Sequence, residues 1–182
     1  MYSKAELRMM ELDMFRLSHL VDGFVIGVLD ANANVDSNAC QMLMQSHDDH
    51  EFTFHRAFDM CNDPFEATQQ LIKLNFSRVL TSGQQKSADL GKELIKQLQS
   101  KFGDEISFMA GGGINEDNLK AILEESGIKE FHASARTKRK SAMEFRNEKC
   151  HMGNEGDDEF SISVTSEERV RKMVQIYQSV VR

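Results

Sequence analysis

The sequence GFVIGVL, residues 23–29, contains no charged residue and is apolar on both faces of an extended chain. Such a run is typical of a parallel strand, because helices cover both faces of a parallel sheet. The centres of five such runs lie roughly 23 to 29 residues apart, which is enough for one strand, one helix and two tight turns. The four runs that follow the first are FTFH (52–55), SRVLTSG (77–83), ISFMAGGG (106–113) and EFHAS (130–134).

The segments between these runs carry helical signals. Asp63-Pro64-Phe65-Glu66 combines an N-cap aspartate, a proline at the first helical position and an acidic first turn. Thr165-Ser166-Glu167-Glu168 has the pattern of a capping box. Residues 135–160 are polar without a period, so we expect a long loop there. Helices are expected over 4–20, 36–46, 87–102, Asn115–Gly127, and onward from Asp63 and Thr165, with apolar stripes at Met10, Met14, Leu17 and Val21, at Leu90, Leu94 and Leu98, and at Val170, Met173, Val174 and Tyr177.

This alternation of strands and helices predicts an α/β fold with a parallel sheet. The periodicity leaves open whether the sheet is doubly wound or part of a (β/α) barrel. Only five strands are visible, which is too few for a closed eight-stranded barrel. No linker divides the chain, and we expect residues 1–182 to form a single domain.

Composition and charge exclude several classes of protein. The formal net charge of −7 argues against a nucleic-acid partner, because phosphate backbones attract basic surfaces. No apolar run approaches the ~18 residues of a membrane helix, and the acidic N-terminus lacks the apolar core of a signal peptide. The three cysteines, Cys40, Cys61 and Cys150, have no metal-site spacing and suit a reducing compartment. We therefore expect a cytoplasmic protein.

Polar residues and glycines follow each expected strand. In open parallel sheets and barrels alike, ligands bind at the carboxyl ends of the strands, so these residues are the candidate site. They are His55, Arg56 and Asp59 after the second strand, Thr81, Ser82 and Gly83 after the third, Gly111, Gly112 and Gly113 after the fourth, and His132, Ser134 and Arg136 in and after the fifth.

The residue types leave several roles open. The glycines of MAGGGINEDNL (109–119) either bind an anion ahead of a helix N-terminus or make a tight turn. His55 is a general acid or base, a ligand, or a core histidine. Arg56 needs a partner if it is buried, and Asp59 is a candidate. Cys150-His151-Met152 offers donors that suit Cu(I), although adjacent residues rarely all face one ion. The basic run 136–140 is interpreted either as a solvated loop or, because it follows the last expected strand, as an extension of an anion site.

Several segments resemble successive blocks of the CutC copper-homeostasis family. In order along the chain they are DGFVIGVLDANANVD (22–36), FTFHRAFDMCNDP (52–64), RVLTSG (78–83), MAGGGINEDNL (109–119), EFHASAR (130–136) and MEFRN (143–147). The resemblance covers nearly the whole chain, and HRAFD together with GGGI is its most specific part.

The resemblance implies a (β/α)8 barrel, a cytoplasmic setting and a role in copper handling. It also implies that the five visible strands are strands four to eight of the family barrel, so that two to three βα units are missing and the barrel is incomplete. The cysteines proposed as Cu(I) ligands in animal members lie on those units. The strand-eight thiol of animal members is replaced here by Ala133, so the metal ligands of this chain stay unknown.

An incomplete barrel has two open strand edges, at residues 23–29 and 130–134, and such edges invite pairing with another chain. We therefore expect a homo-oligomer or association through these edges. The leading functional hypothesis is copper homeostasis with Cu(I) binding. The alternatives are a barrel enzyme that acts on a small phosphorylated or carboxylated metabolite, and a non-catalytic truncated variant that associates with full-length subunits.

Overall fold

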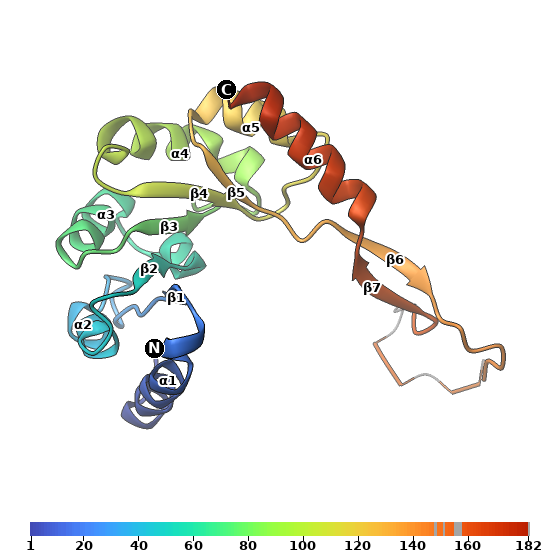
Figure 1. The fold of residues 1–182 in the computed structure, drawn as a ribbon, viewed down its shortest axis with the longest axis horizontal. Helices are drawn as coiled ribbons and strands as arrows, with labels where there is room; N and C mark the ends of the chain where they lie inside the picture. The colour runs from blue at the N-terminus through green and yellow to red at the C-terminus, as the bar shows by residue number, and fades with distance from the viewer. Residues whose placement is uncertain (148, 151, 155–157, 182) are drawn as a thin grey trace.

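The computed structural model describes residues 1–147, 149–150, 152–154 and 158–181. Its centre is a five-stranded parallel sheet in the order β1-β2-β3-β4-β5, so each strand lies beside the next one in the chain (Figure 1). This confirms the expected α/β fold with five parallel strands, and the arrangement is that of an incomplete TIM-type barrel. The strands are β1 (Gly23–Ile26), β2 (Glu51–Phe54), β3 (Arg78–Thr81), β4 (Ser107–Gly111) and β5 (Glu130–His132).

Helices α2 to α5 connect successive strands and lie along one side of the sheet (Figure 1). Strand residues alternate accordingly: Phe54, Val79 and Phe108 are buried beneath the helices, whereas Val25 on the other face is 62% exposed. None of the described helices is long and apolar enough to cross a bilayer. The helices are α1 (Lys4–Leu17), α2 (Ser37–Met44), α3 (Pro64–Lys73), α4 (Ala88–Phe102), α5 (Leu119–Ser126) and α6 (Glu167–Val180), with 3-10 turns η1 (Ser18–Leu20) and η2 (Arg56–Met60).

Two of the helix signals read from the sequence are confirmed in atomic detail. The Asp63 carboxylate accepts hydrogen bonds from the backbone N–H groups of Phe65 and Glu66, and Pro64 is the first residue of α3. Gly127 ends α5 in the left-handed conformation, at φ 74°. These short-range signals place helix ends correctly because the atoms that satisfy them are only a few residues apart.

Parts of the expected apolar stripes are wrong. Leu90 is 65% exposed, and the buried stripe of α4 runs through Ala88, Gly91, Ile95, Leu98 and Phe102 instead. The reason lies at Gly91, where α4 approaches the chain after β3 so closely that a β-carbon would lie 1.9 Å from the Ser82 carbonyl oxygen. That contact fixes the rotation of the helix. Leu17, Val21, Val170 and Val174 are also exposed, although Met14 and Met173 are buried as expected.

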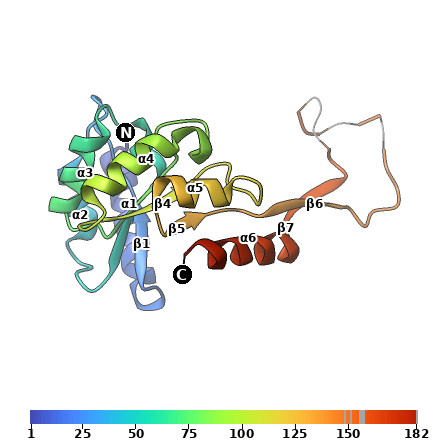
Figure 2. The same ribbon diagram turned by 90° about the horizontal axis from the view of Figure 1, so that it is seen from above.

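The end of the chain also differs from expectation. The basic run 136–140 is not a loop: it forms β6 (Arg136–Lys140), which pairs antiparallel with β7 (Ser161–Thr165). The two strands form a ribbon that projects from the body of the molecule (Figure 2). A strand with five exposed residues shows no apolar alternation, so its sequence carries no strand signal.

Helix α5 begins at Leu119 rather than just after Asn115, because the Asn115 side chain caps a separate turn by accepting from the N–H groups of residues 117 and 118.

Candidate functional site

The candidate site lies where β2, β3 and β4 end. Strand β2 runs directly into η2, so that His55 and Arg56 stand at the carboxyl end of the strand and Asp59 lies one turn further. The segment 81–83 follows β3, and the glycines 111–113 follow β4. Because the strands are parallel and adjacent, their ends meet at one edge of the sheet.

Asp59 is the centre of a hydrogen-bond network. One carboxylate oxygen accepts from the Thr81 hydroxyl (2.5 Å), the Ser82 backbone N–H (2.9 Å) and the Gln84 backbone N–H (3.3 Å). The other accepts from the Ser82 hydroxyl (3.0 Å) and the Arg56 Nε–H (2.7 Å). The side chain is only 7% exposed. The lone pairs of the Asp59 carboxylate are therefore occupied, so the carboxylate can hold Arg56, Thr81 and Ser82 in position.

Arg56 is held by this network while part of its guanidinium stays free. Its Nη2 donates to the Ser82 hydroxyl at 2.8 Å, and its side chain is 45% exposed. Its Nη1 makes no hydrogen bond to another described residue. That nitrogen lies over Gly112, where a β-carbon would approach it to 3.1 Å and where φ is +106°. Glycine is therefore required at position 112 for both space and backbone conformation.

His55 is oriented by its own backbone. Its Nδ1 accepts a hydrogen bond from the Ala57 N–H (3.1 Å), so the neutral ring carries its proton on Nε2. The ring packs over Gly27, where a β-carbon would lie 2.5 Å from Nδ1. His55 also lines a cavity of about 250 Å³ between α1 and β1, together with Met10 and Val25. The imidazole Nδ1 is therefore occupied by the Ala57 N–H, and the Nε2–H group can donate a hydrogen bond to a ligand.

The triple glycine makes a well-fixed turn. Gly112 and Gly113 have positive φ, and their carbonyl oxygens accept from the Ala88 N–H and the Asn118 side chain, both at 2.9 Å. Helix α5 starts only at Leu119. The free N–H groups of that helix are thus separated from the glycines by a turn, contrary to the expected direct glycine–helix junction.

The remaining candidate residues lie on and beyond β5. His132 is exposed and pairs with Gly111 in the β4–β5 register, so it borders the glycine turn. Ser134 and Arg136 are also exposed, and their backbone carbonyls accept from the Thr165 hydroxyl and the Arg169 guanidinium. Neither of the two side chains hydrogen-bonds to the Arg56–Asp59 network. They belong to the base of the β6–β7 ribbon.

Two contacts of the site were not expected from the sequence. The Gln84 side-chain amide donates to the Cys61 carbonyl (2.7 Å) and approaches its sulfur (3.4 Å), which joins η2 to the chain after β3. Glu116, in the turn after the glycines, forms a bidentate ion pair with Arg169 on α6. That pair lowers the pKa of Glu116 to about 2. The partners lie 23 and 53 residues apart, so no local pattern announces either contact.

The described cysteines do not form a metal centre. Burial raises the pKa of the Cys40 and Cys61 thiols to about 11, which keeps them protonated near neutral pH. Cys150 is exposed. Of the sequence Cys150-His151-Met152, the histidine lies outside the described residues. Among residues that the structure describes, no three His, Cys, Asp or Glu side chains are grouped as metal ligands.

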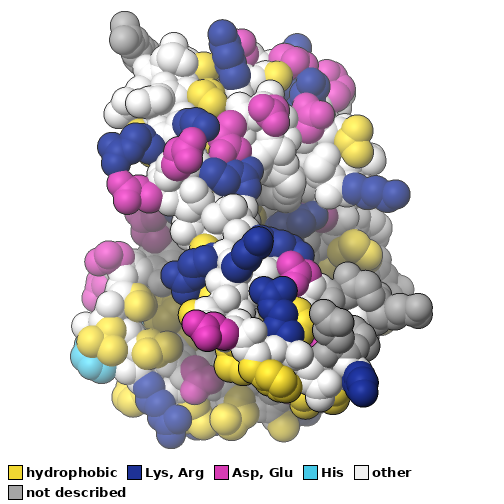
Figure 3. All heavy atoms as spheres, turned by 90° about the vertical axis from the view of Figure 1, so that its right-hand side faces the viewer, with side chains coloured by type: hydrophobic (Ala, Val, Ile, Leu, Met, Phe, Trp, Pro, Cys, Tyr) yellow, Lys and Arg dark blue, Asp and Glu magenta, His cyan; other side chains and the backbone are white. Residues whose placement is uncertain are grey.

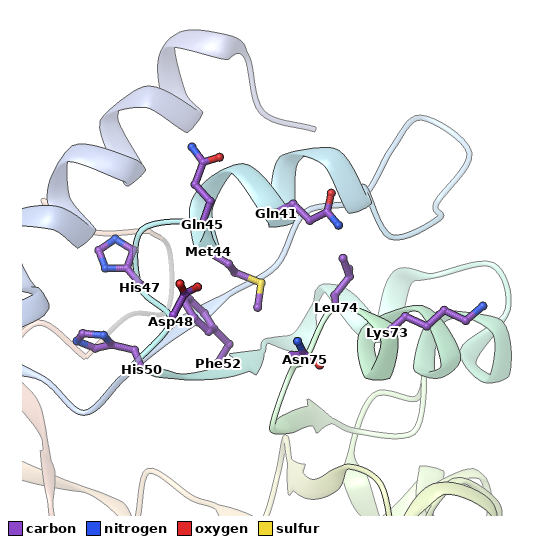
Figure 4. A pocket seen from close by; sticks show the side chains of 10 residues that line it. All are labelled: Gln41, Met44, Gln45, His47, Asp48, His50, Phe52, Lys73, Leu74 and Asn75. Carbon is purple, nitrogen blue, oxygen red and sulfur yellow. The ribbon is translucent and has the colours of Figure 1, made fainter.

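A separate cavity of about 410 Å³ lies beside the amino end of β2 (Figure 4). His47 and His50 line it, with ring centroids 5.6 Å apart, and the His50 Nε2 donates to the Ser18 carbonyl oxygen at 2.8 Å. Within the described chain, the Nδ1 atoms of both rings have no hydrogen-bond partner. Burial, and then the neighbouring imidazole, lower the pKa of His47. This cavity is at the end of β2 opposite to the candidate site.

The comparison with family models matches residues 1–137 to the CutC family. A family protein CutC of Bacteroides thetaiotaomicron is 43% identical over 98% of this chain and 73% of its own length. The Mus musculus "Copper homeostasis protein cutC homolog" is also 43% identical, over 99% of this chain and 67% of that protein.

Solved structures agree with this match. The putative copper homeostasis protein CutC of Streptococcus agalactiae superposes with a TM-score of 0.69 and 32% identity over 72% of this chain and 65% of that chain. The present chain thus spans less than two thirds of that relative. A structure titled "Native KDPGal structure" has a TM-score of 0.51 at 14% identity, covering 94% of this chain and 76% of that one, and supports the fold alone. With matching blocks from β1 through β5 and relatives of this identity along nearly its whole length, the chain belongs to the CutC family.

Proposed function

We propose that this protein takes part in copper homeostasis and that Cu(I) is its cargo. The observation that carries the proposal is the 43% identity, over nearly the whole chain, to mammalian proteins that bear the name copper homeostasis protein. The conserved fold alone would not support it, because one barrel fold serves many functions.

Cu(I) prefers thiolate, thioether and imidazole ligands. Accessible donors of this kind include the Cys150 thiol and, close to it in the chain, the Met152 thioether, which is 92% exposed. Cys40 and Cys61 are poor donors because their thiols are buried and protonated. Since the described residues hold no group of three ligands, we propose that a single chain binds Cu(I) weakly, or that two chains share the ion.

Competition with a colorimetric Cu(I) chelator under anaerobic conditions tests this proposal. Cys150→Ser should weaken Cu(I) binding, whereas Met9→Leu, which removes a thioether from an exposed face of α1, should not. An apparent affinity no higher than that of an unrelated methionine-rich protein would remove copper binding from the function of this chain.

A second candidate function is that of a barrel enzyme acting on a small phosphorylated or carboxylated metabolite. The position of the Arg56 Nη1 over Gly112 favours this function. The Arg56 Nε and Nη2 are held by Asp59 and Ser82, so the Nη1 is oriented to donate to an anion. In this candidate function, Arg56 and the glycine turn hold the anion, and His55 moves a proton through Nε2. Asp59 positions Arg56, since its own oxygens are occupied.

A thermal-shift screen with phosphosugars and small carboxylic acids tests the second function. At least one anion should raise the melting temperature of the protein, and Arg56→Ala should abolish that rise. Arg16→Ala is the matched control, because Arg16 is an exposed arginine with only a distant ion pair of 3.9 Å. Stabilisation that survives Arg56→Ala would exclude Arg56 as the anion-binding group.

The proposed setting is the cytoplasm. We propose further that residues 1–182 act as one partial barrel domain equivalent to family strands four to eight, and that β1 and β5 offer open edges for association with a second copy or with full-length subunits. Size-exclusion chromatography of the chain, alone and mixed with a full-length relative, tests the association. A strictly monomeric, well-folded chain in both experiments would refute it.

A further inference from the structure

His47 and His50 lie at the amino end of β2 with nitrogens that lack hydrogen-bond partners. Both residues belong to the segment that joins α2 to β2, and their rings lie on the same side of the cavity of about 410 Å³, toward the end of α1 (Figure 4). His47 is 3% exposed, and His50 is half-buried. The Nδ1 atoms of both rings are shielded from solvent and have no partner among the described residues. Because a buried polar atom without a partner is costly, a ligand, an ion or a water is expected to bind these nitrogens.

The hydrogen bond of His50 determines which of its nitrogens can bind a cation. Its Nε2 lies 2.8 Å from the Ser18 carbonyl oxygen, which can only accept, so Nε2 carries the proton. The Nδ1 atom of the neutral ring then holds a lone pair that no described residue uses. Histidines that bind metals usually donate their other N–H group to a carbonyl or carboxylate, which fixes the tautomer and the orientation of the ring. The contact with Ser18 therefore orients His50 as a metal ligand.

The two imidazoles lie close enough to share one ion. Their ring centroids are 5.6 Å apart, and the ring planes are inclined at 86°. Two rings that bind one ion through nitrogen bonds of about 2.0 Å have centroids about 5–6 Å apart. The Phe24 ring lies beside both, with its centroid 5.1 Å from that of His47 and 5.2 Å from that of His50. A cation between the two imidazoles would also lie near this ring, whose face attracts positive charge.

The donors and charges around the pair suit a soft monovalent ion. Zn²⁺ usually takes four ligands, and within the described part of the chain no third His, Cys, Asp or Glu side chain joins this pair. The cost of desolvating an ion rises steeply with its charge, so a buried divalent ion needs carboxylates to balance it. Glu11 on α1 acts on His47 through its charge, but it is already paired with Arg8. Cu(I) carries a single charge, and two neutral imidazole nitrogens can satisfy it.

The pair can be reached from solvent and lies apart from the Cys150 thiol. Gln45 and Asp48 line the same cavity and are exposed, so the cavity opens to the surface. The segment between β6 and β7, which contains Cys150, lies at the other end of the molecule (Figure 1). Over the described residues of that end, basic and acidic side chains are mixed and histidines do not gather (Figure 3). A metal ion at the histidine pair would therefore be bound independently of Cys150.

We propose that His47 and His50 bind one Cu(I) ion between their Nδ1 atoms. The inference rests on the proposed function, in which Cu(I) is the cargo, and it gives that cargo a binding site without cysteine. The ion enters and leaves through the cavity. Because thiolates are the softer ligands, two imidazoles hold Cu(I) less tightly than a pair of cysteines does. The site therefore suits transfer of the ion to another carrier rather than permanent storage.

Anaerobic titration of the Cys150→Ser chain with Cu(I), in competition with a colorimetric chelator, isolates this site. The Cys150→Ser chain should still bind one ion. A further His47→Gln or His50→Gln substitution should weaken that binding at least about tenfold, because losing only a hydrogen-bond partner of a metal ligand already costs about that much. His19→Gln is the matched control, since His19 is an exposed histidine next to Ser18, and it should leave the binding unchanged.

Nitrogen-15 NMR of the histidine rings in the wild-type chain gives a readout that does not depend on the folding of the variants. On addition of one equivalent of Cu(I), the resonances of His47 and His50 should shift together while those of His19 stay in place. Ring resonances of the pair that do not move, as expected if only water occupies the site, would overturn the proposal.

The titrations distinguish failure of this site from failure of the proposed function. If Cys150→Ser abolishes all Cu(I) binding, or if the remaining binding survives both histidine substitutions, the protein still handles copper but the histidine pair is not its site. If the wild-type chain binds no Cu(I), both the histidine site and the proposed function are wrong.

Discussion

Replacing Asp59 by asparagine should destabilise the protein strongly. The carboxylate accepts hydrogen bonds from Arg56, Thr81, Gln84 and, through both its backbone and its hydroxyl, Ser82. Thr81 and Ser82 are fully buried, so water cannot replace an acceptor that their donors lose, although the Ser82 hydroxyl has a second acceptor in the Gln85 carbonyl at 2.6 Å. An asparagine amide keeps one oxygen, but its NH₂ group replaces the oxygen that accepts from Arg56 and the Ser82 hydroxyl. Donors would then face donors at that position.

The size of the effect follows from the bonds that are lost. A hydrogen bond to a charged group contributes about 1.5–3 kcal/mol, and the two bonds on the substituted side, from Arg56 and Ser82, are not independent. Because Arg56 is 45% exposed and the Ser82 hydroxyl keeps the Gln85 carbonyl as an acceptor, we expect the free energy of unfolding to fall by about 2 kcal/mol. For a chain of this size that corresponds to a fall in melting temperature of about 4–8 °C.

Asp63→Asn is the matched control. Asp63 lies four residues away and also accepts two backbone hydrogen bonds, but it does so as a helix N-cap on the surface, where asparagine caps about as well. Urea unfolding followed by circular dichroism should place this variant within about 0.5 kcal/mol of the wild type. If Asp59→Asn and Asp63→Asn unfold with equal free energies, the network around Asp59 does not hold the site together.

Three further predictions concern the rest of the molecule. His47 is only 3% exposed, and its burial lowers the pKa of the folded state below the unfolded value, so the free energy of unfolding should decrease as the pH falls below about 6.5. His47→Gln should remove this pH dependence from a stability profile measured between pH 5 and 8. Gly91→Ala should lower the free energy of unfolding by about 3 kcal/mol, since the new β-carbon meets the Ser82 carbonyl, and a smaller loss in denaturant unfolding would contradict the close approach of α4. Glu116 has a folded pKa of about 2 beside Arg169, so its contribution is present above about pH 4.5 and is lost as the pH falls toward 2; Glu116→Gln should flatten the acid limb of the stability curve, and an unchanged acid limb would argue against the ion pair.

The parallel sheet and most helix starts could be predicted because their signals are local. The Asp63 cap, the Pro64 start and the Gly127 stop each depend on atoms within one helical turn. The rotation of α4 could not be predicted this way, because the approach of Gly91 to Ser82 involves two elements that fold onto each other. The spacing of Leu90, Leu94 and Leu98 by four residues predicted one buried face, and that prediction is wrong at Leu90.

The candidate site shows the same division. The topology rule correctly brought the strand ends together, and the network of Arg56, Asp59, Thr81 and Ser82 lies there. This rule predicts which residues lie near one another, but it does not predict their hydrogen-bond partners. The hydrogen bonds that Asp59 accepts from Arg56, Thr81, Ser82 and Gln84 could therefore not be predicted from the sequence. The ribbon escaped prediction because β6 and β7 are separated by twenty residues and β6 contains no apolar residue. The residues of β7, SISVT, do alternate between polar and apolar, but so short a run does not identify its partner strand.

The open face of the sheet carries both polar and apolar side chains. Arg78 on β3 reaches across β4 to form a bidentate ion pair with Glu130 on β5, and it also faces Thr53. Charged groups that are paired and still touch water lose little from being uncovered. Leu80 and Met109 lie half-buried on the same face, and Val25 on β1 is 62% exposed. Covering this face would therefore bury apolar surface from β1 to β4, and Val25 would lose the largest share of its exposed area.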